Sequence, residues 1–252
     1  MVCGTTGEAS TLTDEEQIET VRFAVSAAKK RIPVIAGAGS NDTEHGKRLC
    51  AGCRKAGADA VLLVTPYYNK TTQKGLIEHF TAMASAAEVP VILYNIPPRT
   101  GLSMSPKTTF ELSKVENIAG IKESSKDIVH VTQIAELCGD GLTIYSGDDD
   151  NILPILALGG KGVISVLANL VPRVVHDIVE SFAEGDLKRS RKLQFGALPL
   201  FRALFCEVNP IPVKAALNLM GYNVGGYRAP LTTMEDANFK FLKNELQNYG
   251  LL

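Results

Sequence analysis

The alternation of strand-like and helix-like patterns is the feature that most constrains how this chain can fold. Short apolar runs recur about every 25 to 30 residues, and helical patterns separate them. Strands that alternate with helices form parallel βαβ units, because two parallel strands need a long crossover connection. The runs predict seven parallel strands, at residues 1–4, 32–37, 60–65, 89–94, 118–122, 142–146 and 162–166.

The pattern changes beyond Pro172, where only helices are predicted, at residues 173–184, 186–205, 212–219 and 233–248. An open dinucleotide-binding sheet would show Gly-x-Gly-x-x-Gly after its first strand, and that motif is absent there. We therefore predict an α/β fold. It is a (β/α)₈ TIM barrel that lacks its first βα unit, in residues 1–185, followed by a C-terminal helical extension in residues 186–252.

Composition narrows the possible classes of function. The 252 residues carry a net charge of −1 and no basic block, which argues against a nucleic-acid partner. No apolar run approaches the roughly 18 residues that a membrane span needs. The five cysteines are scattered, so we expect a reducing compartment, the cytoplasm. Cys50 and Cys53 form a C-x-x-C inside a helical pattern, where core packing is favoured over metal binding.

The ends of the predicted strands carry the candidate site residues. In a parallel barrel the carboxyl ends of the strands converge at one mouth. Lys122 ends the fifth strand, and burial there would disfavour its charged form. A neutral amine attacks a carbonyl carbon to form a Schiff base. The other strand ends bring Thr5 and Thr6, Tyr94 to Gly101, Ser146 to Asp149, and Ile164 with Ser165.

Together these groups suit a reaction of a 2-oxo acid through an imine. Lys122 would be the nucleophile, and the phenol of Tyr94 would move protons. The Thr5-Thr6 turn can hold one carboxylate, and Arg99 can hold a second. We expect no metal and no cofactor, because the imine with the substrate does the chemical work.

Three of these residues have simpler alternatives. Lys122 could be a surface lysine paired with Glu123. Tyr94 could be a core aromatic whose hydroxyl meets a backbone group, and Arg99 could be an ordinary surface residue.

Two further segments could serve as helix caps. The Thr5-Thr6 turn could cap the helix that follows it. For the acidic run Asp148–Asp150, capping of the next helix is favoured over metal binding, since no histidine accompanies it. It is less probable that all these residues lie at the same mouth for unrelated structural reasons than that they form one active site. This favours the catalytic interpretation of Lys122.

Six segments of the chain resemble the dihydrodipicolinate synthase family, also called 4-hydroxy-tetrahydrodipicolinate synthases. The family belongs to the pyruvate-dependent class I aldolases of the N-acetylneuraminate lyase type. The resemblance extends from Met1 to Leu252. It is carried by Gly4-Thr5-Thr6-Gly7-Glu8, Thr65-Pro66-Tyr67-Tyr68-Asn69-Lys70, Tyr94-Asn95-Ile96-Pro97-Pro98-Arg99-Thr100-Gly101, Gly120-Ile121-Lys122-Glu123, Ser146-Gly147-Asp148-Asp149 and Asn209-Pro210-Ile211-Pro212-Val213-Lys214.

The resemblance implies condensation of pyruvate with L-aspartate-4-semialdehyde on the diaminopimelate route to lysine. It implies Lys122 as the Schiff-base lysine, Tyr94 as the proton-shuttling phenol and Thr6 as a hydroxyl that relays protons between two tyrosines. The second tyrosine would be Tyr68, which in the family reaches into the neighbouring subunit's site. A homo-oligomer follows, a dimer of dimers in the family. Substrate contacts are implied for Thr5, Arg99, Gly147 and Ile164.

Two departures from the family pattern qualify this interpretation. Family members begin about forty residues earlier, which suggests an N-terminal truncation and leaves open a non-catalytic relative that only binds. Asn41 and Tyr67 match the cleft that binds lysine in inhibited members, but Asp14, Gln17 and His45 differ, so we expect weak or absent lysine inhibition. A second enzymatic alternative is a lyase acting on a sugar-derived 2-oxo acid, which would offer Arg99 no second carboxylate.

Overall fold

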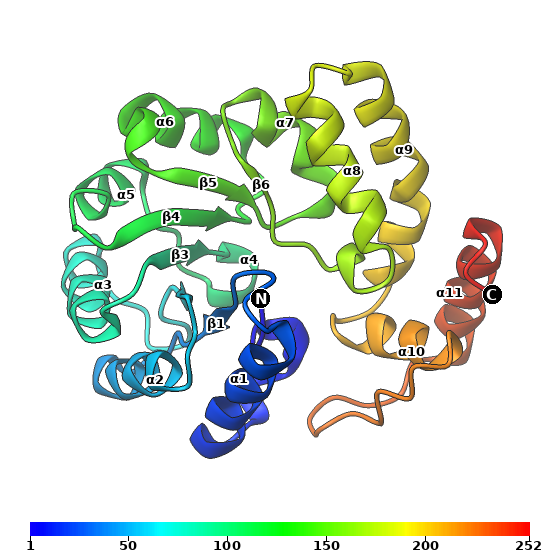
Figure 1. The fold of residues 1–252 in the computed structure, drawn as a ribbon, viewed down its shortest axis with the longest axis horizontal. Helices are drawn as coiled ribbons and strands as arrows, with labels where there is room; N and C mark the ends of the chain where they lie inside the picture. Colours follow the sequence, from blue (N-terminus) through cyan, green and yellow to red (C-terminus); the bar gives the residue numbers. More distant parts are fainter.

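Six parallel strands form one sheet in the computed structural model, which describes residues 1–252 (Figure 1). Their order in the sheet follows their order in the sequence, and every neighbouring pair is parallel. This confirms the predicted parallel α/β architecture. The strands are β1 (Ile35–Gly37), β2 (Ala60–Val64), β3 (Val91–Asn95), β4 (Ile118–Glu123), β5 (Thr143–Ser146) and β6 (Gly162–Val163).

The two ends of the sheet differ from the sequence prediction. The first predicted strand is reduced to a single bridge between Val2 and Ala36, because the next residue, Cys3, has a left-handed backbone with φ of 54° and leaves the strand conformation. The last strand, β6, is shorter than the predicted 162–166, and no further strand pairs with its outer edge. The sheet is therefore open. That it represents a barrel without its first unit stays a prediction.

The helices that connect the strands surround one face of the sheet (Figure 1). The first begins with a capping box, in which Thr13 accepts from the Glu16 amide and the Glu16 carboxylate accepts from the Thr13 amide. A short helix α4 (Pro97–Thr100) directly follows β3 and was not expected. The others are α1 (Asp14–Ala28), α2 (Thr43–Lys55), α3 (Gln73–Ala87), α5 (Pro106–Leu112), α6 (Ile128–Cys138) and α7 (Ile152–Ala157).

The layer between these helices and the sheet forms the larger apolar core. Phe80, Leu63, Leu93 and Ile121 are fully buried in it. Cys50 and Cys53 pack in the same core, as predicted. The opposite, inner face of the sheet carries a small apolar cluster of Leu62, Ile92 and Tyr94, with Ile35, Val64, Ile96, Tyr145 and Ile164 packed against it.

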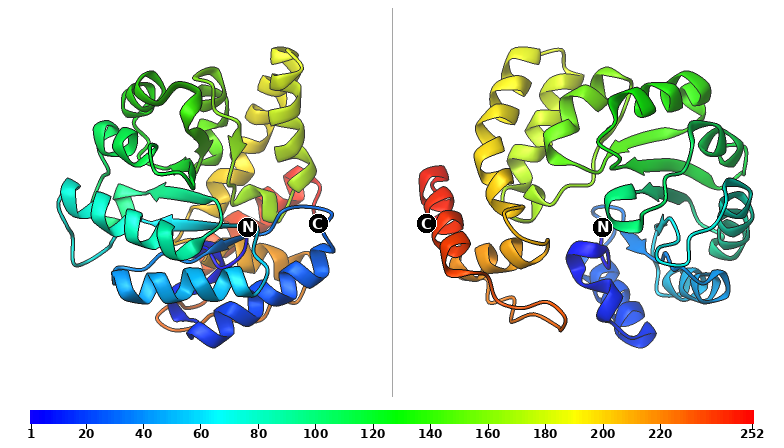
Figure 2. Two further views of the ribbon diagram at one scale, coloured as in Figure 1. Left: turned by 60° about the vertical axis from the view of Figure 1, so that its left-hand side comes forward. Right: turned by 180° about the vertical axis from the view of Figure 1, so that it is seen from behind.

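Four helices complete the chain and form a second apolar core. They are α8 (Pro172–Ala183), α9 (Leu187–Leu204), α10 (Ile211–Leu219) and α11 (Asp236–Tyr249). The segment between α10 and α11 reaches back toward α1 (Figure 2), where Arg228 forms two hydrogen bonds with the Glu16 carboxylate. The division into residues 1–185 and 186–252 stays a prediction. No helix is both long and apolar enough to cross a membrane.

Candidate active site

Lys122 and Tyr94 lie side by side on the inner face of the sheet. They are paired residues of the β3–β4 ladder, so their side chains emerge from the same face. The Lys122 Nζ atom lies 4.0 Å from the centroid of the Tyr94 ring. Tyr145 pairs with Lys122 on the other side, in β5. The sheet register therefore places the amine between two aromatic residues.

Burial changes the acid–base properties of the lysine. Lys122 is only 9% exposed, and this desolvation lowers the pKa of its amine to about 8. The nearby Asp148 and Asp149 carboxylates act in the opposite direction, because they favour the charged amine. About one amine in ten is then neutral at pH 7. A surface lysine paired with Glu123 is excluded, since successive strand residues face opposite sides of the sheet.

The phenol of Tyr94 is buried and remains protonated. Desolvation raises its pKa to about 12, so the hydroxyl is a proton donor at neutral pH. The hydroxyl makes no hydrogen bond to a backbone group, unlike a core tyrosine held by its surroundings. The Ser124 side chain lies within hydrogen-bonding reach of this phenol, whose ring packs against the Lys122 amine.

Gly147 makes room for the lysine stem. A Cβ atom at this position would lie 1.8 Å from the Ser124 Oγ and 2.9 Å from the Lys122 Cε. Only glycine fits the loop after β5 at this point without displacing both neighbours. Ile164 donates its backbone N–H to the Ser146 carbonyl at 2.8 Å, and its side chain packs with the Tyr94 cluster.

A cavity of about 310 Å³ lies next to Tyr94, whose ring separates it from the Lys122 amine. Its lining includes Thr5, Tyr94 and Arg99, three of the predicted site residues, together with Tyr67. Thr5 belongs to a short 3₁₀ turn (Thr5–Gly7), and neither Thr5 nor Thr6 caps the turn with its side chain. The helical elements that follow have Glu8 and Thr13 at their N-cap positions, so the capping alternative for Thr5 and Thr6 is wrong.

Thr6 and Tyr68 are placed differently from the other predicted residues. The Thr6 Oγ1 accepts a hydrogen bond from Asn209 Nδ2 at 2.9 Å. Tyr68 is 93% exposed and has a left-handed backbone with φ of 68°, which is rare for an aromatic residue. Within this chain Tyr68 does not line the cavity. The structure thus gathers Lys122, Tyr94, Thr5, Arg99, Gly147 and Ile164 at one place, with Thr6 adjoining and Tyr68 apart.

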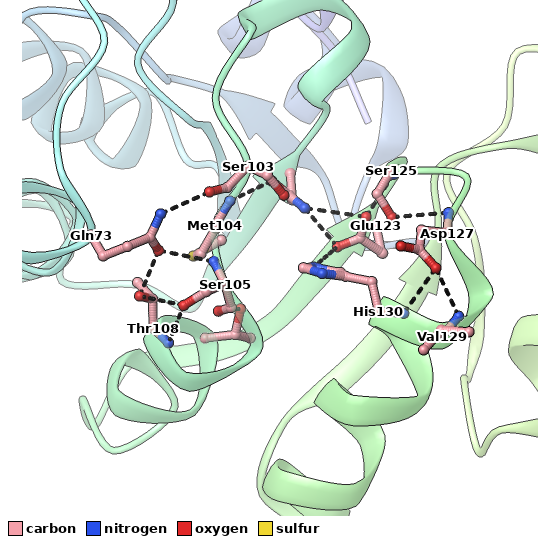
Figure 3. A network of polar contacts seen from close by, with 12 residues as sticks. Gln73, Ser103, Met104, Ser105, Thr108, Glu123, Ser125, Asp127, Val129 and His130 are labelled. Carbon is pink, nitrogen blue, oxygen red and sulfur yellow. Dashed lines mark hydrogen bonds and ion pairs between the residues drawn. The ribbon is translucent and has the colours of Figure 1, made fainter.

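A polar network supports the strand ends from behind (Figure 3). Glu123 follows Lys122, faces the helices and is 2% exposed. Its carboxylate accepts from Asn95 Nδ2 at 3.3 and 3.0 Å and from the Ser125 amide at 2.6 Å, and His130 Nε2 lies 3.7 Å away. Burial raises the pKa of the Glu123 carboxyl, and these donors oppose the rise.

The acidic run after β5 does not cap the next helix, so that expectation is wrong. Neither Asp148 nor Asn151 makes a side-chain cap at the two turns that follow. The Asp149 carboxylate instead accepts from the amides of Val166 and Leu167 at 3.1 and 3.0 Å, beyond β6. These amides open a 3₁₀ turn (Leu167–Asn169) and have no earlier carbonyl to bond, so Asp149 joins two site loops.

Sequence reasoning gave no role at the site to three of its neighbours. Asn209 contacts both Thr6 and Arg99, whose Nη2 donates to the Asn209 carbonyl at 3.0 Å. Tyr145 flanks Lys122, which the strand register could have revealed. Asp148 is partly buried near Lys122, and desolvation raises the pKa of its carboxyl to about 6.

The fold and the site together define a class of protein. It is an imine-forming enzyme of the class I aldolase type. At the carboxyl ends of its parallel strands, a buried amine with a lowered pKa packs against a protonated phenol. The phenol in turn lines a cavity that also has hydroxyl and guanidinium groups. The Dihydrodipicolinate synthetase family matches residues 1–249. This chain is a member of that family.

Individual relatives agree with this assignment. A 4-hydroxy-tetrahydrodipicolinate synthase of Lachnoclostridium phytofermentans is 58% identical over 253 residues, covering 100% of this chain and 86% of the relative. The dihydrodipicolinate synthase of Acinetobacter baumannii complexed with pyruvate is 41% identical, with a TM-score of 0.97 over 100% of this chain and 87% of that structure. The enzyme of Cyanidioschyzon merolae with lysine bound is 40% identical, with a TM-score of 0.96. That match covers 100% of this chain and 86% of the solved structure. That about forty residues are missing stays a prediction.

Proposed function

We propose that this protein condenses pyruvate with L-aspartate-4-semialdehyde to 4-hydroxy-tetrahydrodipicolinate, on the diaminopimelate route to lysine. The observation that carries the proposal is the buried Lys122 amine, 4.0 Å from the ring of Tyr94, a residue that lines one cavity together with Thr5 and Arg99. Membership of the family supports the choice of substrates.

Imine formation begins with the neutral Lys122 amine. It attacks C2 of pyruvate, and the new C–N bond gives a carbinolamine whose oxygen leaves as water. The Tyr94 hydroxyl supplies the proton for that departure, since its raised pKa keeps it protonated. The turn at Thr5 and Thr6 offers hydroxyl and amide donors to the pyruvate carboxylate.

Carbon–carbon bond formation follows from the same imine. The Tyr94 oxygen, which gave up its proton as water left, takes a proton from the pyruvate methyl group. This gives an enamine, whose carbon attacks the aldehyde of the second substrate. The aldehyde oxygen takes up a proton, relayed through Tyr94 and Thr6. Arg99 pairs with the carboxylate of the second substrate, using the N–H groups that the Asn209 carbonyl leaves free. The amino group of the second substrate then attacks the imine carbon and displaces the Lys122 amine, which closes the ring and frees the lysine. The imine serves as the electron sink, so the proposal includes no cofactor.

Tyr68 serves the site of a second subunit in this proposal, which makes a homo-oligomer the working form. Two observations support it: Tyr68 is 93% exposed, and its φ of 68° is a conformation that costs an aromatic residue of order 1 kcal/mol or more. Sedimentation velocity tests the assembly, and Tyr68→Phe should then lower kcat without dissociating it. A strictly monomeric, fully active protein would contradict this part.

The proposal is tested by trapping the imine. Incubation with pyruvate and sodium borohydride should add the mass of one reduced pyruvate adduct to the intact chain. Lys122→Ala should abolish the adduct, and Lys161→Ala, an exposed lysine next to β6, should not. A folded protein that gains no mass would leave only the non-catalytic binding alternative.

The sugar-acid lyase alternative is separated by the second substrate. Arg99→Ala should leave the pyruvate adduct intact and raise the KM for aspartate semialdehyde by roughly 10- to 100-fold, because a charge-assisted hydrogen bond contributes about 1.5 to 3 kcal/mol. Cleavage of N-acetylneuraminate or of a 2-keto-3-deoxy sugar acid, insensitive to Arg99→Ala, would favour the alternative.

A further inference from the structure

Asn209 lies between two residues that the proposed function assigns to different substrates and steps. It precedes α10 and is 6% exposed. Its side-chain Nδ2 donates to Thr6 Oγ1 at 2.9 Å, across 203 residues of sequence. Its backbone carbonyl accepts from Arg99 Nη2 at 3.0 Å, across 110 residues. One residue of the C-terminal region therefore touches both groups.

The side chain of Asn209 makes no other hydrogen bond. Its Oδ1 atom is buried without a partner, an arrangement that costs free energy and is uncommon in folded proteins. An asparagine that only anchored the C-terminal helices would bond within them, as Asn238 does with Glu207. The Asn209 side chain is instead directed to the threonine turn at the site.

Neighbouring contacts fix this junction at a second point. Lys214, one turn further along α10, pairs with Glu8 at 3.0 Å, and both side chains are largely buried. Lys214 also donates to the Gly226 carbonyl. Because Glu8 directly follows the turn that carries Thr6, the start of α10 and the threonine turn are held together at two places.

The direction of the hydrogen bond determines what Thr6 can do. A hydroxyl has one proton to donate and two lone pairs that accept. When the Asn209 amide donates to one lone pair, the Thr6 proton must point elsewhere and remains available to a phenol or a substrate oxygen. The Asn209 carbonyl likewise uses a single guanidinium N–H, which fixes the position of Arg99 and leaves its other donors free.

We propose that Asn209 is a positioning residue that orients the Thr6 hydroxyl as a proton donor and, through its own carbonyl, holds Arg99 toward the second substrate. Its side chain anchors the backbone whose carbonyl Arg99 contacts, so the two effects are linked. The proposal rests on the proposed function. It also makes the C-terminal helical region part of the active site rather than an appendage.

The test compares Asn209→Ala and Asn209→Asp with a matched control, Asn238→Ala, in the full chain. Asp has the size of Asn but no amide donor for Thr6. Both Asn209 variants should raise the KM for aspartate semialdehyde and lower kcat by roughly 3- to 10-fold each, the range for loss of one hydrogen bond. The KM for pyruvate and the final yield of borohydride-trapped adduct should stay within about twofold.

A double-mutant cycle with Thr6→Val separates positioning from a merely structural role. If Asn209 acts through Thr6, the loss of kcat in Thr6→Val/Asn209→Ala should not exceed that of the more damaging single variant. Multiplicative losses, unchanged constants in both Asn209 variants, or an equal loss in Asn238→Ala would overturn the proposal. If Asn209→Ala is unfolded at room temperature, the kinetic constants of the isosteric Asn209→Asp variant alone test the proposal. Absence of any adduct in the unaltered protein would instead refute the proposed function itself.

Discussion

Asn95 donates its side-chain amide to both carboxylate oxygens of Glu123, at 3.3 and 3.0 Å, one residue beyond the pair formed by Tyr94 and Lys122. The two pairs are consecutive steps of the same ladder and face opposite sides of the sheet. The buried hydrogen bonds between Asn95 and Glu123 therefore fix the spacing of β3 and β4 next to the point where Tyr94 and Lys122 extend from the sheet. Positioning of the amine against the phenol depends on this support.

Removing the Glu123 carboxylate should destabilise the fold. Glu123→Ala leaves the Asn95 amide and the Ser125 N–H buried without acceptors, which should lower the free energy of unfolding by about 2 to 4 kcal/mol. Glu123→Gln keeps one acceptor oxygen, so its free energy of unfolding should fall by about half as much. Urea unfolding measures both. Glu111→Ala removes an exposed carboxylate, and its free energy of unfolding should stay within about 0.5 kcal/mol of that of the unaltered protein. Equal losses of stability in all three variants would contradict a supporting role for the Asn95–Glu123 hydrogen bonds.

Adding one methyl group at Gly147 should disable the lysine. The Cβ of Gly147→Ala would overlap the Ser124 Oγ and press on the Lys122 stem, so the amine must move away from Tyr94. We expect the rate of borohydride trapping to fall at least about 100-fold, since small misplacements of reacting groups cost that much. Gly162→Ala is the control, because its Cβ would meet Tyr145 at an ordinary 3.7 Å. A normal trapping rate in Gly147→Ala would show that the lysine tolerates the shift.

Strand periodicity was enough to predict where Lys122 and Tyr94 emerge. Each ends an apolar run, and parallel strands bring their carboxyl ends together, so the pair follows from local patterns and one rule of topology. Glu123 was a harder case. The sequence alone allowed it to pair with Lys122, and only the alternation of strand faces shows that it supports the sheet from the other side.

Contacts between distant segments could not be predicted in the same way. Nothing in the local pattern around Asn209 indicates that it meets Thr6, because that contact depends on how the C-terminal helices return to the sheet. The role of Asp149 was missed for a related reason. Its partners, the amides of Val166 and Leu167, belong to a turn whose free N–H groups appear only in the folded chain.

Lysine should inhibit this protein weakly or not at all. The three side chains that differ from the family's lysine cleft already have partners. The Asp14 carboxylate bonds His45 at 2.8 Å, His45 also meets the Ser40 hydroxyl at 3.0 Å, and Gln17 donates to the Gly37 carbonyl at 2.6 Å. A zwitterionic ligand would have to break these contacts. Half-inhibition by submillimolar lysine in a steady-state assay would contradict the expectation, and His45→Ala should increase the response.

The rate of imine formation should rise with pH through the pKa of Lys122. Because burial lowers that pKa from 10.5 to about 8, the amine is charged and unreactive below pH 8 and neutral above it. The trapping rate should therefore increase about tenfold per pH unit between pH 6 and 7.5 and level off above about pH 8.5. A midpoint near 10.5 would mean that the lysine is solvated.

Asp148→Asn tests the electrostatic part of this profile. The Asp148 carboxylate favours the charged form of Lys122, so its removal should lower the pKa of the lysine further and move the rate profile toward acid. The pKa of Asp148 is itself raised to about 6, and below that pH the carboxyl is neutral in the unaltered protein. The difference between the two proteins should therefore be largest between pH 6.5 and 8 and vanish below pH 5. Lys122→Ala gives the background rate. An unchanged profile in Asp148→Asn would mean that desolvation alone, and not the nearby charge, controls the pKa of the amine.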